Sequence, residues 1–347
     1  MSAHLLQAGD KLELDTDAIG DGEDEEGELF TSWGNSYGWL TWKAFFSPRI
    51  RARTVASLGR VSRSRVGDMT DPGRIRGPES VTVSDKAHYD FAGIKQDWTL
   101  DLSDRMAFRT GFLVNRLMGD YDYSNFTTTL VAKPNGDIVG IPDSVDSHLN
   151  PDGTEIEAYG ALRIQPVPWG TAEIGVRYDR RTHTGDEDVS PRINALVDLG
   201  PRTTLRAGWG VYHQSQGMHE LEAGDGETEF APSERASQVA LGLEHRFDNG
   251  LTARLEAYNR TVDRPRRMYL NLWREVLPFP ELDGDRVRVD PDESRSKGIE
   301  ALVQQESGKW DWSVGYTLSS TETHLEGNWV PQYWDQTHAL AVSYTHL

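Results

Sequence analysis

The chain has 347 residues and no cysteine, which excludes a disulfide framework, a thiolate zinc site and a cysteine nucleophile. Its formal net charge of -19 at pH 7 argues against a phosphate-binding surface, so no nucleic-acid partner is expected. The apolar runs are only a few residues long, far below the ~20 that a membrane-spanning helix requires.

The first 36 residues are expected to form an acidic segment, either a loop or a partial strand. They contain no basic start followed by an apolar core of signal-peptide length, so either the protein stays in the cytoplasm or its true beginning is missing. The acidic run at residues 21–28 could bind calcium through carboxylates, but its spacing matches no EF-hand. A hydrated loop is the favoured interpretation.

A period of two residues, typical of strands with two different faces, begins after residue 36. It continues through the next stretch, where three arginines share one side. The first alternation sets Leu40, Trp42, Ala44 and Phe46 against Tyr37, Trp39, Thr41 and Lys43. The second sets Ile50, Ala52, Thr54, Ala56 and Leu58 against Arg49, Arg51, Arg53, Val55 and Ser57.

Five strand pairs then repeat one plan, each with a short turn between two alternating runs. The fourth turn, Asp248-Asn249-Gly250, is of a type preferred in tight hairpins because Asn and Gly tolerate positive φ. The other turns lie at 103–104, 166–170, 200–201 and 306–308.

Long polar segments separate these hairpins, so short turns alternate with long loops. Strands of roughly ten residues with this asymmetry are typical of an outer-membrane β-barrel, which has short periplasmic turns and long extracellular loops. A soluble sandwich or propeller does not need one end to carry nearly all the loop length. The long segments lie at 65–86, 120–153, 181–189, 214–234, 262–293 and 321–336.

Several short motifs, in order, resemble the barrel of TonB-dependent receptors. They are residues 178–180 (YDR), 189–194 (VSPRIN), 205–212 (LRAGWGVY), 230–236 (FAPSERA), 256–260 (EAYNR), 296–300 (SKGIE) and 334–340 (WDQTHAL). Each motif alone is weak, but their order and hairpin spacing are fairly specific. The resemblance covers about residues 35–342. It implies an all-β, antiparallel transmembrane barrel, of which this chain supplies about 10–14 strands out of ~22.

Two departures from the family pattern define the expected domains. The plug domain and the TonB-contacting segment should precede the barrel, and neither is visible before residue 35. Residues 37–341 are therefore expected to be the barrel segment. Residues 342–347 resemble the translation of a sequencing adapter and are expected to be a non-native tail, the alternative being an ordinary strand.

No pattern in the sequence indicates a catalytic site or a metal-binding site. The histidines show no His-Glu-x-x-His spacing, and there is no Ser-His-Asp arrangement or phosphate loop, so neither an enzyme nor a cofactor is expected. Arg49, Arg51 and Arg53 could line a lumen and meet anionic groups. Cross-strand pairing with inward carboxylates such as Asp97 or Glu173 is an equal alternative.

The resemblance implies a receptor in the bacterial outer membrane that takes up a scarce nutrient with TonB-coupled energy, the nutrient being a siderophore, cobalamin or oligosaccharide. The partners implied are outer-membrane lipid, the small nutrient, and TonB acting through a plug absent from this chain; the barrel is expected to be monomeric. Aromatic residues favour binding surfaces, so Tyr212, Tyr269, Trp273 and Trp329 are the candidate ligand contacts. The alternatives are a passive porin-like or structural barrel, an outer-membrane barrel enzyme and a soluble β-protein.

Overall fold

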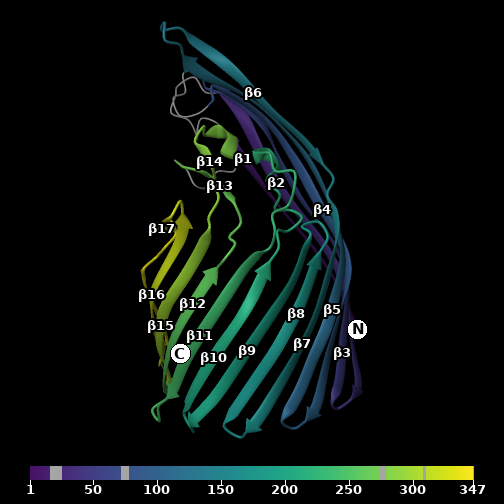
Figure 1. Ribbon diagram of the computed structural model, residues 1–347, viewed down its shortest axis with the longest axis vertical. Helices are drawn as coiled ribbons and strands as arrows, with labels where there is room; N and C mark the ends of the chain where they lie inside the picture. The colour runs from purple at the N-terminus through teal and green to yellow at the C-terminus, as the bar shows by residue number, and fades with distance from the viewer. Residues whose placement is uncertain (16–25, 72–77, 273–278, 308–309, 347) are drawn as a thin grey trace.

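A computed structural model describes residues 1–15, 26–71, 78–272, 279–307 and 310–346. Nearly all of them are strands of one antiparallel sheet (Figure 1). Among the described residues, no helix is long and apolar enough to cross a membrane. The first nine strands are β1 (Ser2–Asp15), β2 (Glu26–Ser47), β3 (Ile50–Thr70), β4 (Ser80–Ser103), β5 (Met106–Ala132), β6 (Ile138–Leu149), β7 (Asp152–Val167), β8 (Gly170–Arg181) and β9 (Asp186–Gly200). The rest are β10 (Thr203–Gln214), β11 (Glu234–Arg246), β12 (Leu251–Val262), β13 (Met268–Asn271), β14 (Arg286–Val289), β15 (Glu293–Ser307), β16 (Trp310–Leu325), β17 (Asn328–Pro331) and β18 (His338–His346).

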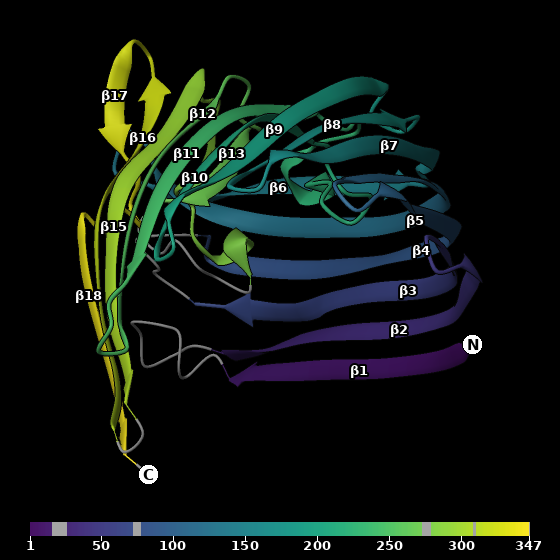
Figure 2. The same ribbon diagram turned by 90° about the horizontal axis from the view of Figure 1, so that it is seen from below.

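Neighbours in the sheet follow the order of the chain, as in a meander. The hydrogen-bonded path runs β1-β2-β3-β4-β5-β7-β8-β9-β10-β11-β12-β15-β16-β17, with β6 paired to β5 and β18 to β16. The described residues give this sheet sixteen strands, and β13 and β14 form a separate pair. Figure 2 shows that the sheet curls into an open trough, as the twist of successive strands requires. The expected fold class, an antiparallel barrel in part, is confirmed, although the sheet has more strands than the 10–14 expected.

The convex face of the trough carries continuous rows of apolar side chains. Residues directly opposite each other in antiparallel strands share a face, so the register identifies these rows. Ile174 and Ile193 are exposed, and no other described element lies against this face. One row of successive cross-strand partners consists of Leu100, Phe108, Leu162, Ile174, Ile193, Trp209 and Val239.

The apolar part of the convex face is a band with a definite height. On β3 it runs from Leu58 to Ile50, a stretch of nine residues, which is within the ~9–11 residues that a tilted barrel strand needs to cross the hydrocarbon. At the end near the short turns, Phe46 and Trp98 stack with ring centroids 5.5 Å apart. Beyond Leu58 the convex rows turn polar, as in the row formed by Ser32, Ser64, Lys86 and Asp122.

Four of the five expected hairpins, β4–β5, β7–β8, β9–β10 and β11–β12, have the predicted form. The turn of the fifth hairpin includes residues outside the described ones. Residues 65–86 and 120–153, expected as loops, are instead mostly strand: β3 and β4 extend to Thr70 and from Ser80, and β5 and β6 form a hairpin. These strands continue past the apolar band, so their convex residues are polar and the alternation of apolar with polar residues fades. Their Thr, Tyr and Val content still favours strand.

The first and last described segments of the chain are also strands of the sheet. Residues 2–15 pair with β2 along their whole length, so this part of the expected acidic segment is β1. Most of the acidic run at 21–28 lies outside the described residues. Residues 342–346 belong to β18 and pair with β16. That they are non-native stays a prediction, as does the division into three segments.

Two long connections fold back onto the concave face rather than away from the sheet. We call them the cap: residues 215–233, with the 3-10 turn Ala223–Asp225, and the described residues of 263–292, with β13, β14 and the 3-10 turn Pro280–Leu282. Figure 2 shows β13 and the neighbouring turn inside the curve of the sheet. Phe279 and Leu282 of the cap are buried against a cluster on β2 to β5, formed by Leu29, Met69, Val81, Val83 and Tyr123.

Candidate functional site: the cap and the concave wall

A buried ionic cluster ties the cap to the sheet. Arg65 on β3 lies between two carboxylates, with Nη2 2.7 Å from Asp85 Oδ2 on β4 and 3.0 Å from Glu281 Oε1 in the cap. Its side chain is only 11% exposed. Burial alone would lower the pKa of Arg65, but the two carboxylates outweigh burial and raise it. Arg65 therefore stays charged and holds the cap by an ion pair that is mostly out of water.

Tyr123 on β5 adds a second bond to the same cap carboxylate. Its hydroxyl donates to Glu281 Oε1 at 3.1 Å. Burial, and then the negative charge of Glu281, raise the pKa of Tyr123 above its ordinary value of 10. The hydroxyl thus keeps its proton and remains a donor. Three neighbouring strands, β3, β4 and β5, meet the cap at this point.

Further ion pairs join the two halves of the cap to each other. Arg286 makes a bidentate contact with Asp225, at 2.6 Å to Oδ1 and 2.5 Å to Oδ2, and donates to Asn271 Oδ1 at 2.9 Å. Arg266 Nη1 lies 2.7 Å from Glu220 Oε2. These ion pairs link residues 215–233 to residues 263–292. A displacement of one half of the cap should therefore displace the other half as well.

The root of the cap is fixed to β8 and β9. Ser233 donates its backbone N–H to Asp186 at 3.0 Å and its hydroxyl to Asp188 at 2.6 Å. Arg181 donates to the hydroxyl of Ser215 at 3.0 Å, at the other end of the same connection. Gln216, almost fully buried, accepts from the backbone of residue 231 at 2.7 Å. Residues 215–233 are thus closed at both ends by polar bonds.

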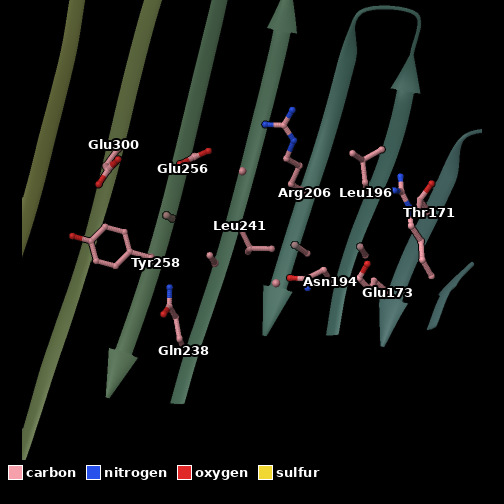
Figure 3. A pocket seen from close by; sticks show the side chains of 17 residues that line it. Thr171, Glu173, Asn194, Leu196, Arg206, Gln238, Leu241, Glu256, Tyr258 and Glu300 are labelled. Atoms are coloured by element: carbon pink, nitrogen blue, oxygen red, sulfur yellow. The ribbon is translucent and has the colours of Figure 1, made fainter. Parts of the chain in front are cut away.

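A wide hollow of about 530 Å³ lies on the wall formed by β7 to β12 and β15. Figure 3 shows polar and charged side chains reaching into it from neighbouring strands. Glu256 and Glu300 are direct cross-strand partners there, so two carboxylates lie side by side. Two arginines, Arg163 and Arg206, also line the hollow, and Arg206 Nη1 lies 3.3 Å from Glu244 Oε2. The lining includes Glu173, Asn194, Arg206, Gln238, Glu256, Tyr258 and Glu300. This wall is suited to water and to polar solutes, in contrast to the apolar convex rows.

Two of the three arginines expected to line the lumen are paired with carboxylates. Arg51 Nη2 is 2.9 Å from Asp101 Oδ2, and Arg49 Nη2 is 3.4 Å from Asp104 Oδ1. Arg53 lies opposite Asp97 in the register, with no ion pair between them. The cross-strand alternative therefore describes two of the three arginines, although their partners are Asp101 and Asp104. Glu173 on β8 is paired with Arg109 on β5, across the intervening strand β7.

The candidate ligand contacts are not brought together by the structure. Tyr269 is in the cap, where its hydroxyl is 3.5 Å from Glu227 and Arg286 lies over its ring at 5.8 Å. Tyr212 is on β10 and is 45% exposed. Trp329 is on β17, with Arg295 3.9 Å above its ring. Trp273 lies outside the described residues. A ligand role for these four stays a prediction.

The residues that build the cap were missed by reasoning from the sequence. Arg65 and Glu281 are 216 positions apart, and nothing local to either predicts their contact. The weak signal was the concentration of charge in the segments 214–234 and 262–293, which were expected as long loops. Among the described residues, no group of three His, Asp or Glu side chains is placed to hold a metal ion.

Comparisons with known proteins agree with this architecture. A family model described as TonB dependent receptor-like, beta-barrel matches residues 11–347. No curated protein matches the sequence. Among solved structures, the unliganded ferric citrate transporter FecA is similar with a TM-score of 0.57 and 14% identity, over 92% of this chain and 47% of that one.

Two further solved structures show the same fold. The outer membrane transporter YddB from Escherichia coli has a TM-score of 0.53 and 11% identity, over 99% of this chain and 59% of its own. The FrpB iron transporter from Neisseria meningitidis has a TM-score of 0.50 and 14% identity, over 93% of this chain and 54% of its own. The chain thus spans about half the length of these proteins. Their likeness concerns the fold, while the family model covers nearly the whole sequence: the chain belongs to the TonB-dependent receptor family and matches its β-barrel.

Proposed function

We propose that this chain is the barrel part of a receptor in the bacterial outer membrane that takes up a scarce nutrient with energy supplied through TonB. The observation that carries the proposal is the cap, which is folded over the concave face and tied there by Arg65 and Tyr123. When a barrel closes, its concave face becomes the lumen. A loop fixed over the lumen narrows the entrance and offers a capture surface, which a simple pore would not need.

The charged wall below the cap is suited to the passage of the nutrient after its capture. Its carboxylates, amides and arginines can exchange water for the polar groups of a passing solute. A plug domain elsewhere in the same protein would contact this wall and receive work from TonB. The lipid partner would be the hydrocarbon around the convex rows.

The nutrient belongs, in this proposal, to the siderophore, cobalamin or oligosaccharide class. Proteins of similar structure include one named a ferric citrate transporter and one named an iron transporter, which favours an iron chelate as the first nutrient to test. Tyr212, Tyr269, Trp273 and Trp329 remain the proposed aromatic contacts.

Uptake by living cells tests the proposal. A strain lacking the gene for this protein, and the same strain complemented, would be given labelled ferric siderophore, cobalamin or oligosaccharide at limiting concentration, with TonB present or deleted. We expect one nutrient to enter only when both the gene and TonB are present. Entry that depends on the gene but not on TonB would overturn the proposal and identify a passive barrel.

A further inference from the structure

A small cup lies between the concave face of β2 to β5 and the cap. It encloses about 140 Å³ and is lined by three aromatic side chains, Trp33, Tyr89 and Tyr121, together with Arg63. His219 of the cap borders it, with its ring 5.9 Å from that of Tyr89. The cup is separate from the wide hollow on the opposite part of the wall, with which it shares no lining residue.

The floor and walls of the cup come from one cross-strand row. Trp33, Arg63, Ala87 and Tyr121 are successive partners on β2, β3, β4 and β5. The small Ala87 lies between larger neighbours, which leaves room above it. Tyr121 is almost fully buried and its hydroxyl is bonded to the backbone oxygen of residue 218, so this wall is fixed.

Arg63 supplies hydrogen-bond donors that are not in use. Its Nη2 lies 3.1 Å from Asp85 Oδ2, and its Nε is buried with no hydrogen-bond partner among the described residues. A buried donor without an acceptor is costly, and such groups in folded proteins are usually satisfied by protein, water or ligand. Arg63 and Arg65 face three carboxylates, Asp85, Glu222 and Glu281, so Arg63 offers directed donors rather than a net positive field.

We propose that the cup is a binding subsite for a single aromatic ring bearing an anionic oxygen, such as a carboxylate or a phenolate. The faces and edges of Trp33, Tyr89 and Tyr121 favour a flat ring with π-electrons. A cavity of about 150 Å³ holds one benzene-sized ring, so the cup accommodates one ring and no more. The anionic oxygen forms a charge-assisted bond with the guanidinium of Arg63, which lines the cup and whose side chain is 31% exposed.

The inference deepens the proposed function and rests on it, since the ring would be one part of the nutrient that the receptor captures. The position of the cup matters here: one wall belongs to the sheet and the border at His219 belongs to the cap. A ring bound in the cup therefore bridges the two. Its binding should strengthen the attachment of the cap.

Ring-sized probes test this subsite in the full chain held in detergent. Ligand-observed NMR would measure dissociation constants for salicylate, for cyclohexanecarboxylate, which keeps the charge but lacks the aromatic ring, and for benzyl alcohol, which keeps the ring but lacks the charge. We expect salicylate to bind about fivefold or more tightly than either of the others, because each lacks one of the two interactions.

Three variants and a control test whether the stronger binding of salicylate depends on the residues of the cup. Arg63→Gln should remove the advantage of salicylate over benzyl alcohol, and Trp33→Leu should remove its advantage over cyclohexanecarboxylate. Arg60→Gln is the matched control, because Arg60 is an arginine of the same strand that points to the convex face and pairs with Asp90. It should leave all three constants unchanged. Ala87→Leu fills the cup without changing a charge and should abolish salicylate binding.

Equal affinity for the three probes, or an advantage of salicylate that survives both Arg63→Gln and Ala87→Leu, would overturn the subsite. Probe binding is measured without TonB or cellular energy. Its failure would therefore leave TonB-dependent uptake standing, and a failure of uptake would leave a measured subsite in place.

Discussion

At the scale of single residues, the surroundings of a charge decide what it contributes. Arg60 and Arg65 are on the same strand, and each contacts a carboxylate on β4, Asp90 and Asp85. The Arg60 side chain is 59% exposed on the convex face, where ion pairs contribute little. Arg65 is buried under the cap, where the loss of a partner leaves a charge out of water.

Glu281→Gln tests this difference. The substitution removes one of the two carboxylates around Arg65 while Asp85 remains, so we expect the free energy of unfolding to fall by about 1–3 kcal/mol. Denaturant titration of the protein in lipid vesicles measures the change. Asp90→Asn is the control and should cause no measurable loss. A loss of the same size in both variants would show that burial under the cap does not matter.

A second residue gives the cap a dependence on pH. Burial raises the pKa of Glu220, but the hydrogen bond from the Gly217 N–H, at 2.7 Å, and the ion pair with Arg266 have a larger, opposite effect. The pKa of Glu220 is therefore lowered below the usual 4.5. A carboxyl group with a depressed pKa stabilises the folded state above its unfolded-state pKa, and this contribution is lost as the pH falls through the lower, folded-state pKa. We therefore expect the contribution of Glu220 to the cap to be lost in acid.

Hydrogen exchange of residues 215–233, measured between pH 7 and pH 3 and corrected for intrinsic rates, follows this loosening. Protection should be constant at neutral pH and should decrease below about pH 4.5. Glu220→Gln should lower the protection at neutral pH and reduce the decrease in acid. An unchanged decrease in the variant would assign the effect to another carboxyl group.

At the scale of elements, the sequence predicted strands well wherever one face meets an apolar environment. The hairpins β7–β8 and β11–β12 follow directly from alternation and turn residues, because both signals are local. The parts of β3 to β6 beyond the apolar band were not predicted as strands. Polar residues occupy most of their convex face there, and the cap covers much of the concave face. The contact of Arg65 with Glu281 could not be foreseen, since it depends on how a distant connection folds back.

The turn of the β11–β12 hairpin gives a prediction at this scale. Gly250 has a φ of +81°, a conformation that costs a residue with a side chain about 1 kcal/mol or more. Gly250→Ala should lower the free energy of unfolding by that amount. Gly200→Ala, in the turn between β9 and β10, is the control: its φ is not positive and a Cβ there meets no atom within 4 Å. Equal effects in the two variants would contradict the role of positive φ.

At the scale of the whole molecule, two surfaces of one sheet face different solvents. The convex rows are apolar over a height that matches hydrocarbon, while the concave wall carries carboxylates, amides and the cap. A water-soluble β-protein with the same alternation would cover its apolar face with a second sheet or helices. The proposed capture role of the cap and the proposed lipid partner both rely on this division.

Spin labels at neighbouring positions test the division most directly. Each would be placed in the protein in lipid vesicles, at Ile174, Ile193 and Val239 on the convex row and at the adjacent Glu173, Asn194 and Gln238 on the concave wall. Collisions with oxygen, which concentrates in hydrocarbon, and with a water-soluble nickel chelate would then be compared. The account predicts that the first three labels favour oxygen and the second three favour nickel. Nickel access at both sets, or protection from both reagents at the convex row, would contradict it.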